Sequence, residues 1–172
     1  SISYAIPAVS VANKTTYTNT TDKKNNHSFS HNTTAANQYL VVAVSYEAKD
    51  FNSHITSMTY NGSEMTYLEW EYTDNEDYKV EMWGIANPVI GTHTVDFYIA
   101  DEGSKLVAAG AISFNNVNLS DPTRSTSRDY GDASSFSLPV TVPTNGMVMD
   151  AIVWEKKYKD HVVYARIIQS VE

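Results

Sequence analysis

The chain has 172 residues, no cysteine and a formal net charge of −8 at pH 7. This length predicts one domain, residues 1–172, with a core of its own. The acidic balance argues against nucleic acid as a partner, the lack of cysteine excludes disulfides and Cys-ligated zinc, and no apolar run approaches the roughly 20 residues that span a bilayer.

The first eleven residues alternate until they reach a proline. Ile2, Tyr4 and Ile6 share one face, and Pro7 lacks the N–H that a ladder hydrogen bond needs. We predict an edge strand or an extended arm over residues 1–11. The chain starts with serine rather than methionine, which either a removed leader or an artificial boundary would explain.

Residues 13–37 form a polar belt rich in Asn and Thr, with Phe29 as its main apolar anchor. We expect loop or edge structure here, with at most a short strand over residues 28–31. The chain contains Asn-x-Ser/Thr sequons, which are candidate N-glycan acceptors on an exported protein. An Asn- and Thr-rich composition also generates such sequons by chance. The sequons begin at Asn13, Asn19, Asn26, Asn32, Asn61 and Asn118.

Residues 38–46 and 105–114 carry apolar side chains on both faces, which is typical of strands buried between layers. Between them, residues 54–99 hold four aromatic and β-branched runs separated by turn signals. This stretch predicts an antiparallel meander, with a tight turn at Asn61-Gly62.

Strict alternation in the second of these runs places Leu68 and Trp70 on one face and Tyr67 on the other. Tyr67 is therefore the aromatic side chain that we expect at the surface. His93 lies on the apolar face of the last run, where we expect a core or rim histidine rather than a metal ligand.

The remainder of the chain predicts a long polar loop over residues 115–135, followed by strands over 136–142, 147–154 and 161–169. No segment has helical periodicity. The fold class predicted is all-β: an antiparallel two-sheet β-sandwich of about 8–10 strands.

The chain lacks Gly-x-Ser-x-Gly, a phosphate loop, a dinucleotide fingerprint and His-Glu-x-x-His, so we expect a non-enzymatic protein. His27 and His31 would lie about 13 Å apart in an extended segment, too far to share a metal ion. Carboxylates crowd two predicted turns, where they would offer calcium oxygen ligands, although their spacing differs from an EF-hand loop. Solvated acidic turns explain the same pattern. These residues are Asp74, Glu76 and Asp77, and Asp121, Asp129 and Asp132.

Aromatic side chains are the other candidate surface. They could form a face on which sugars stack, although aromatics are favoured on sheets for packing alone. The residues in question are Trp70, Trp83, Trp154, Tyr60, Tyr67, Tyr72, Tyr78 and Tyr98.

Several runs resemble a domain of large exported bacterial and archaeal surface proteins. The runs are residues 38–44, 55–65, 81–83, 87–88 with 91–95, and 111–117 with 121–122. The resemblance covers about residues 28–154 and implies a jelly-roll-like sandwich on a secreted or cell-surface protein, with no catalytic residues to carry over. The chain departs from the pattern after Trp154, where a short charged hairpin and a last strand favour a free-standing subunit. The N-terminal arm also resembles surface filament subunits that donate a strand.

We therefore expect a non-enzymatic extracellular structural protein that self-associates into a homopolymer through β-strand edges. In the sharpest form of this hypothesis, Ile2, Tyr4 and Ile6 insert into a groove of the next copy; pairing of the arm within its own domain is left open. The alternative is a carbohydrate-binding or adhesion module, assisted by calcium.

Overall fold

The computed structural model describes residues 7–21, 24–48, 52–73, 78–100, 106–131, 139–154 and 161–168. Within these ranges the chain forms β-strands and no helix, and every strand pair is antiparallel, which confirms the all-β class. None of the described residues forms a helix that could cross a membrane.

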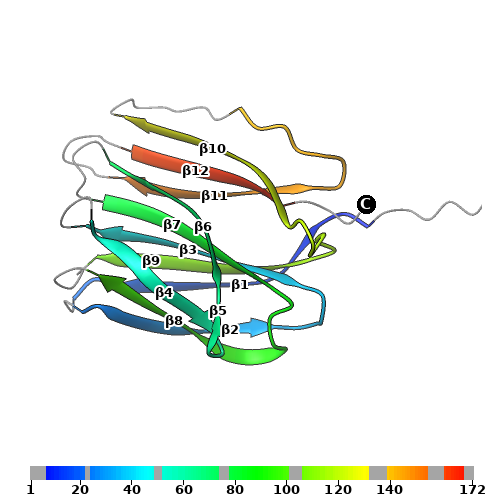
Figure 1. Cartoon of the computed structure of the whole chain (residues 1–172), viewed down its shortest axis with the longest axis horizontal. Helices are drawn as coiled ribbons and strands as arrows, with labels where there is room; N and C mark the ends of the chain where they lie inside the picture. The colour runs from blue at the N-terminus through cyan, green and yellow to red at the C-terminus, as the bar shows by residue number, and fades with distance from the viewer. Residues whose placement is uncertain are drawn as a thin grey trace, which may run out of the picture.

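Two of the sheets form a β-sandwich (Figure 1). The five-stranded sheet has the order β1 (Ser10–Asn19), β9 (Val107–Asn115), β3 (Tyr39–Glu47), β7 (Tyr78–Ala86) and β6 (Thr66–Tyr72). The four-stranded sheet has the order β2 (Asn26–Thr33), β8 (Gly91–Ala100), β4 (His54–Tyr60) and β5 (Ser63–Glu64). Apolar side chains of both sheets meet between them, including Leu40, Val42 and Val44 on β3 and Val95 and Phe97 on β8.

The strand order is nested, because β1 pairs with β9, β2 with β8 and β3 with β7. Nested pairing of this kind is also found in jelly rolls. The jelly-roll class of this chain stays a prediction. The predicted meander over residues 54–99 is wrong, since β4 pairs with β8 in one sheet and β6 with β7 in the other. The chain changes sheets at Met65, whose N–H donates to the carbonyl of Met58 at 2.9 Å.

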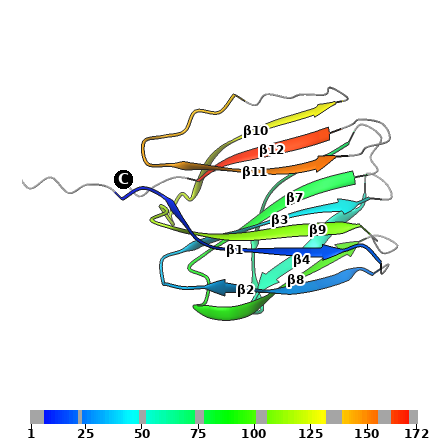
Figure 2. The same ribbon diagram turned by 180° about the vertical axis from the view of Figure 1, so that it is seen from behind.

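A three-stranded sheet lies beside β7 and β3, in the order β10 (Thr123–Gly131), β12 (His161–Ile168), β11 (Met147–Trp154) (Figure 2). Met149 of β11 is buried in a second core cluster with Val41 of β3 and Met82 of β7. Both faces of β3 are therefore covered, which confirms the prediction of a strand buried between layers.

The described residues form twelve strands rather than the eight to ten expected. The difference arises in polar segments, since most of the belt forms β1 and β2, and β10 lies in the predicted loop 115–135. An edge strand can hold its ladder bonds without apolar alternation, so hydrophobic periodicity does not reveal it. The strand predicted over 136–142 is not found in residues 139–142, which begin with Pro139 and precede Pro143; residues 136–138 lie outside the described ranges.

Candidate functional site

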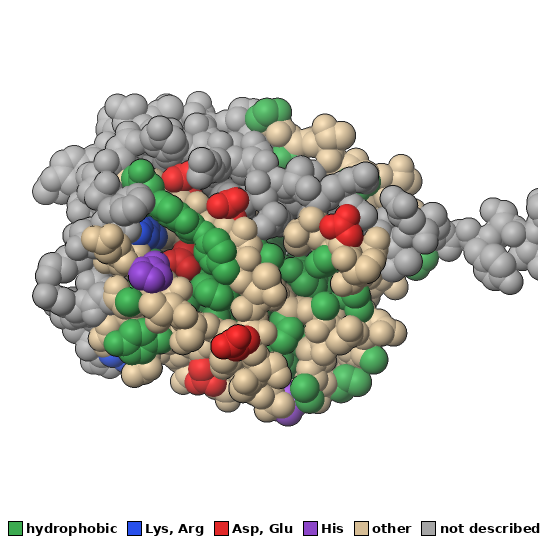
Figure 3. Space-filling model, viewed as in Figure 1, with side chains coloured by type: hydrophobic (Ala, Val, Ile, Leu, Met, Phe, Trp, Pro, Cys, Tyr) green, Lys and Arg blue, Asp and Glu red, His purple; other side chains and the backbone are tan. Residues whose placement is uncertain are grey.

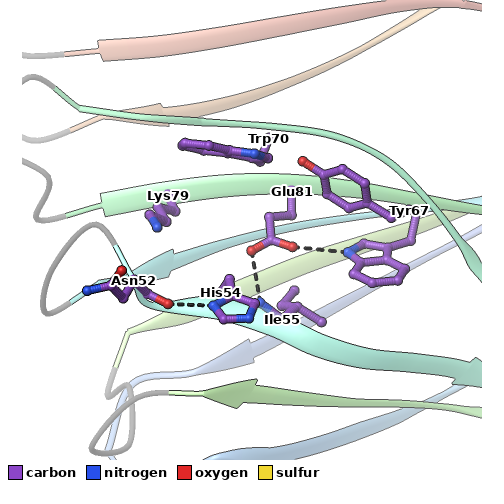
Figure 4. A pocket seen from close by; sticks show the side chains of 8 residues that line it. Asn52, His54, Ile55, Tyr67, Trp70, Lys79 and Glu81 are labelled. Carbon is purple, nitrogen blue, oxygen red and sulfur yellow. Dashed lines mark hydrogen bonds between the residues drawn. The ribbon is translucent and has the colours of Figure 1, made fainter.

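A pocket of about 460 Å³ opens at one edge of the sandwich, between β4 of one sheet and β6 and β7 of the other (Figure 4). β5 pairs only with Thr59 and Tyr60, so it does not extend along the first half of β4. The two sheets can therefore be reached from solvent at that end. The pocket is lined by Asn52, His54, Ile55, Tyr67, Trp70, Lys79, Glu81 and Trp83.

A β-bulge in β6 orients the aromatic wall. The register with β7 shifts between Tyr67 and Glu69, so that Tyr67 lies opposite Trp83 and Trp70 lies opposite Glu81. Cross-strand partners share a face, so both Tyr67 and Trp70 face the pocket. The prediction that these two residues lie on opposite faces is therefore wrong, because strict alternation cannot foresee an inserted residue. The predicted exposure of Tyr67 is confirmed, at 41%.

The polar centre of the pocket is the Glu81 carboxylate, whose residue is only 3% exposed. Its Oε1 accepts hydrogen bonds from the Tyr46 hydroxyl at 2.5 Å and from the Ile55 N–H at 2.9 Å. Its Oε2 accepts one from the Trp83 indole N–H at 3.2 Å. Burial raises the pKa of the Glu81 carboxyl, while these three donors and the Lys79 charge favour its ionised form.

Lys79 places a buried positive charge in the same pocket. Its Nζ donates to the carbonyl of Ser53 at 2.5 Å and lies 5.1 Å from the centroid of the Trp70 ring. Lys79 is 2% exposed. The pocket thus combines one buried carboxylate with one buried ammonium group, so the two formal charges balance.

The rings surround this charged centre. In Figure 4 Trp70 lies above Glu81, while His54 and Ile55 lie below it on β4. Tyr67 contacts Trp83 edge to face, with ring centroids 5.3 Å apart. The His54 Nδ1–H donates to the carbonyl of Asn52 at 2.5 Å, which fixes that imidazole at the rim.

The face seen in Figure 3 includes this edge of the sandwich. Hydrophobic side chains gather there beside a histidine, a lysine and acidic side chains. A mixed surface of this kind offers a ligand both apolar contact and hydrogen-bonding partners.

Only part of the pocket could be foreseen. Of the predicted sugar-stacking aromatics, the structure brings together Tyr67, Trp70 and Trp83 in the pocket. Tyr60 is buried in the core, Tyr98 is exposed on the outer face of the four-stranded sheet, and the side chain of Trp154 lies outside the description. Sequence reasoning missed Lys79 and Glu81; their signal is a pair of charges on one face of a strand whose other face is apolar.

The sequons differ sharply in accessibility. Asn26 and Asn61 are exposed, whereas Asn19 is buried. The Asn13 side-chain amide donates to the backbone carbonyl of Asn32 at 2.8 Å, so the bond engages the side chain of one sequon asparagine and the backbone of another. Asn118 Oδ1 accepts hydrogen bonds from the N–H and hydroxyl of Ser120 in its own sequon, at 3.2 and 2.7 Å.

The calcium candidates are not brought together within the described part of the chain. Asp121 is exposed in the turn before β10, and Asp129 lies on β10 itself. Among the described residues, no group of three or more His, Cys, Asp or Glu side chains is placed to hold a metal ion. The other candidates, Asp74, Glu76, Asp77 and Asp132, lie outside the described ranges, as do the arm residues Ile2, Tyr4 and Ile6.

His27 and His31 form what we call the histidine seam, at the sandwich edge where β1 and β2 meet. His31 hydrogen-bonds through Nδ1 with the Thr15 hydroxyl at 2.9 Å and through Nε2 with the Ser113 hydroxyl at 2.8 Å. His27 Nδ1 lies 3.2 Å from the hydroxyl of Tyr17. The seam therefore links β2 of one sheet to β1 and β9 of the other.

Both seam histidines are buried, and burial lowers the pKa of each imidazole. His27 Nε2–H also donates to the carbonyl of Lys24 at 3.0 Å. His93 is half-buried and donates through Nε2–H to the carbonyl of Ile90 at 3.1 Å, so that of the two expected places, core or rim, it occupies the rim.

No protein-family model, curated protein or solved structure matches this chain. The geometry of the site therefore carries the functional argument.

Proposed function

We propose that this chain is a non-enzymatic extracellular protein that binds carbohydrate in the pocket between β4, β6 and β7, and so acts as an adhesion module. The observation that supports it best is the combination of aromatic walls with a balanced pair of buried charges. A volume of about 460 Å³ lies within the usual range of ligand pockets. The resemblance to exported surface proteins is the reason for the extracellular assignment, which is part of the proposal.

The chemistry of the lining favours a neutral ligand with both apolar and hydroxyl-bearing faces. A pyranose ring presents such an apolar face to Trp70 or Tyr67. Its hydroxyl groups can bond to the polar groups at the pocket, among them the Glu81 carboxylate. A cationic ligand would compete with Lys79 for the Trp70 ring, and an anionic one would meet Glu81.

The same lining argues for binding rather than hydrolysis. Glycoside hydrolysis generally uses two carboxyl groups about 5–9.5 Å apart across the scissile bond. Glu81 is the one carboxylate among the eight described lining residues, and three donors already hold it. Its hydrogen bonds suit a structural acceptor rather than a mobile acid or base.

A glycan array followed by titration calorimetry tests the proposal. We expect neutral oligosaccharides to bind, and Trp70→Ala or Tyr67→Ala to weaken binding at least tenfold. Ile90→Ala is the control, because Ile90 is exposed, at 55%, and does not line the pocket. Loss of binding in the control as well, or no binding by the native protein, would contradict the proposal. Binding that survives a chelator would exclude the calcium assistance that the sequence analysis left open.

Assembly through sheet edges is the second candidate function. β1 is a ten-residue edge strand, and such a strand can accept another in a neighbouring molecule. Val9, just before β1, is buried in the second core cluster, and its N–H donates to the carbonyl of Asn145 at 2.8 Å. An arm formed by residues 1–6 would therefore leave the domain from a fixed point.

This candidate predicts that the native protein forms filaments visible by negative-stain electron microscopy. Deleting residues 1–6 preserves Val9 and should leave monomers. Replacing Ile2, Tyr4 and Ile6 with Ser should do the same without shortening the chain. Filaments in both variants would exclude the arm as the link between subunits.

A further inference from the structure

The outer face of the four-stranded sheet carries a hollow of about 160 Å³, on the opposite face of β4 from the pocket. Two cross-strand rows border it, each running over β2, β8 and β4. The first row is Asn26, Tyr98 and Ser57, and the second is Ser28, Asp96 and Thr59.

Asn26 is both a sequon asparagine and the direct cross-strand partner of Tyr98. The Cβ atoms of such partners lie about 4.5–5.5 Å apart on the same face. Asn26 is exposed, and Tyr98 is 38% exposed. A sugar attached to the Asn26 amide would therefore extend over the hollow with the tyrosine ring beside it.

The hollow also offers partners for the polar edge of that sugar. Asp96 is exposed between Ser28 and Thr59, so its carboxylate can accept hydrogen bonds from sugar hydroxyl or acetamido groups. The apolar face of the pyranose would contact Tyr98, as sugar rings do on aromatic side chains. The hollow is about the size of one monosaccharide ring.

We propose that Asn26 is N-glycosylated and that the first sugar, an N-acetylhexosamine, packs against Tyr98 with Asp96 as its hydrogen-bond acceptor. The donor is a lipid-pyrophosphate-linked oligosaccharide of the export pathway. The Asn26 amide nitrogen forms a bond to C1 of the sugar and loses one proton, while the bond from C1 to the pyrophosphate oxygen breaks and the lipid pyrophosphate leaves.

The proposal rests on the export suggested above, but not on ligand binding in the pocket. It also distinguishes Asn26 from the other exposed sequon. Asn61 lies in a tight turn with a φ of 50°, and its aromatic neighbour Tyr60 is buried. A glycan on Asn61 would therefore project from the turn without contacting the buried Tyr60 ring, which makes Asn61 a matched control.

The experiment expresses the full chain in a eukaryotic secretory host that attaches N-acetylglucosamine, and glycopeptide mass spectrometry measures occupancy. Two variants retain a single sequon each, at Asn26 or at Asn61. We expect trimming to the first sugar to preserve a gain in Tm of about 2–4 °C at Asn26 relative to unglycosylated protein, and no gain at Asn61. Tyr98→Thr should abolish the gain at Asn26 while occupancy persists.

Three results would overturn the proposal: an unoccupied Asn26, an equal gain at Asn61, or a gain that survives in Tyr98→Thr. A second measurement does not depend on how that variant folds. In the native glycoprotein, nuclear Overhauser contacts should join the Tyr98 ring protons to those of the first sugar, and their absence would equally contradict it. The outcome is independent of the glycan array, because a chain that binds no sugar in its pocket can still carry this glycan.

Discussion

At its two edges, the sandwich fills the gap between the sheets to different extents. At the β1–β2 edge, buried imidazoles fill the gap between the sheets and bond to hydroxyl groups from both. At the β4–β6 edge, rings line the gap without filling it, and the space left is the pocket of about 460 Å³.

The two edges also differ in the charges that they bury. Glu81 in the pocket faces a buried cation, Lys79, and accepts three hydrogen bonds. The described groups that face the seam histidines are four hydroxyls and one ammonium group, and none of them is a carboxylate. They belong to Thr15, Tyr17, Ser113, Tyr60 and Lys24. Asp96 of β8 faces the opposite side of its sheet. A compensated charge can be retained beside a ligand site, whereas burial of the seam imidazoles favours their neutral form.

The largest effect should come from breaking the charge pair in the pocket. Glu81→Leu removes the negative charge that interacts with the buried Lys79 ammonium and removes the acceptor for three donors. We expect the free energy of unfolding to fall by about 3–5 kcal/mol, as measured by urea titration. Glu64→Leu is the control, because Glu64 is exposed on β5, and its stability should stay near that of the native protein. Comparable losses in both variants would contradict a paired charge at Glu81.

A smaller loss of stability should follow from disturbing the side chains that pack beside the β-bulge of β6. A Cβ on Gly84 would overlap the phenol of Tyr39 and lie 3.2 Å from Leu68 Cδ1. We expect Gly84→Ala to cost about 1–3 kcal/mol, because overpacking shifts Tyr39 and the bulge residue Leu68.

Gly110 of β9 supplies the matched comparison in the same sheet. A Cβ there meets no atom within 4 Å, so Gly110→Ala should leave stability unchanged or slightly raised. Calorimetric Tm values of both variants would check the difference. If Gly84→Ala is as benign as Gly110→Ala, the packing above β7 does not hold the bulge.

The smallest effect on the free energy of unfolding near neutral pH should come from protonation of the seam histidines. A histidine whose folded pKa is lowered stabilises the fold above its unfolded pKa of 6.5, and that stability is lost as the pH falls below 6.5. Glu81 acts with the opposite sign, since its raised pKa favours the fold as the pH falls. This contribution of Glu81 is fully present below the ordinary carboxyl pKa of 4.5 and is lost as the pH rises above it.

We therefore expect the free energy of unfolding to decrease between about pH 7.5 and about pH 5.5, as followed by urea titration at each pH. A double variant, His27→Gln with His31→Gln, should be less stable at pH 7.5 but should lose most of this pH dependence. An unchanged slope in the double variant would show that other groups titrate in this range.

The contrast between the edges also explains which parts could be predicted. β3 was predictable because a strand covered on both faces must be apolar on both, whatever its neighbours are. The histidine seam could not be predicted, because the inward positions of β2 hold His27 and His31, which a hydrophobic pattern counts as polar. The pocket could not be predicted for a different reason. One inserted residue, Leu68, places Trp70 on the same face of β6 as Tyr67.

The sequence by itself determined the all-β class and the surface position of Tyr67, and it limited His93 to the core or the rim. These features depend on local alternation and on side-chain type, which a single strand displays. Only the tertiary structure decided that β4 and β6 belong to opposite sheets, that Glu81 and Lys79 share one pocket and that Asn26 lies opposite Tyr98. Those features depend on register and on pairing between distant segments, and nothing in one strand specifies its partner.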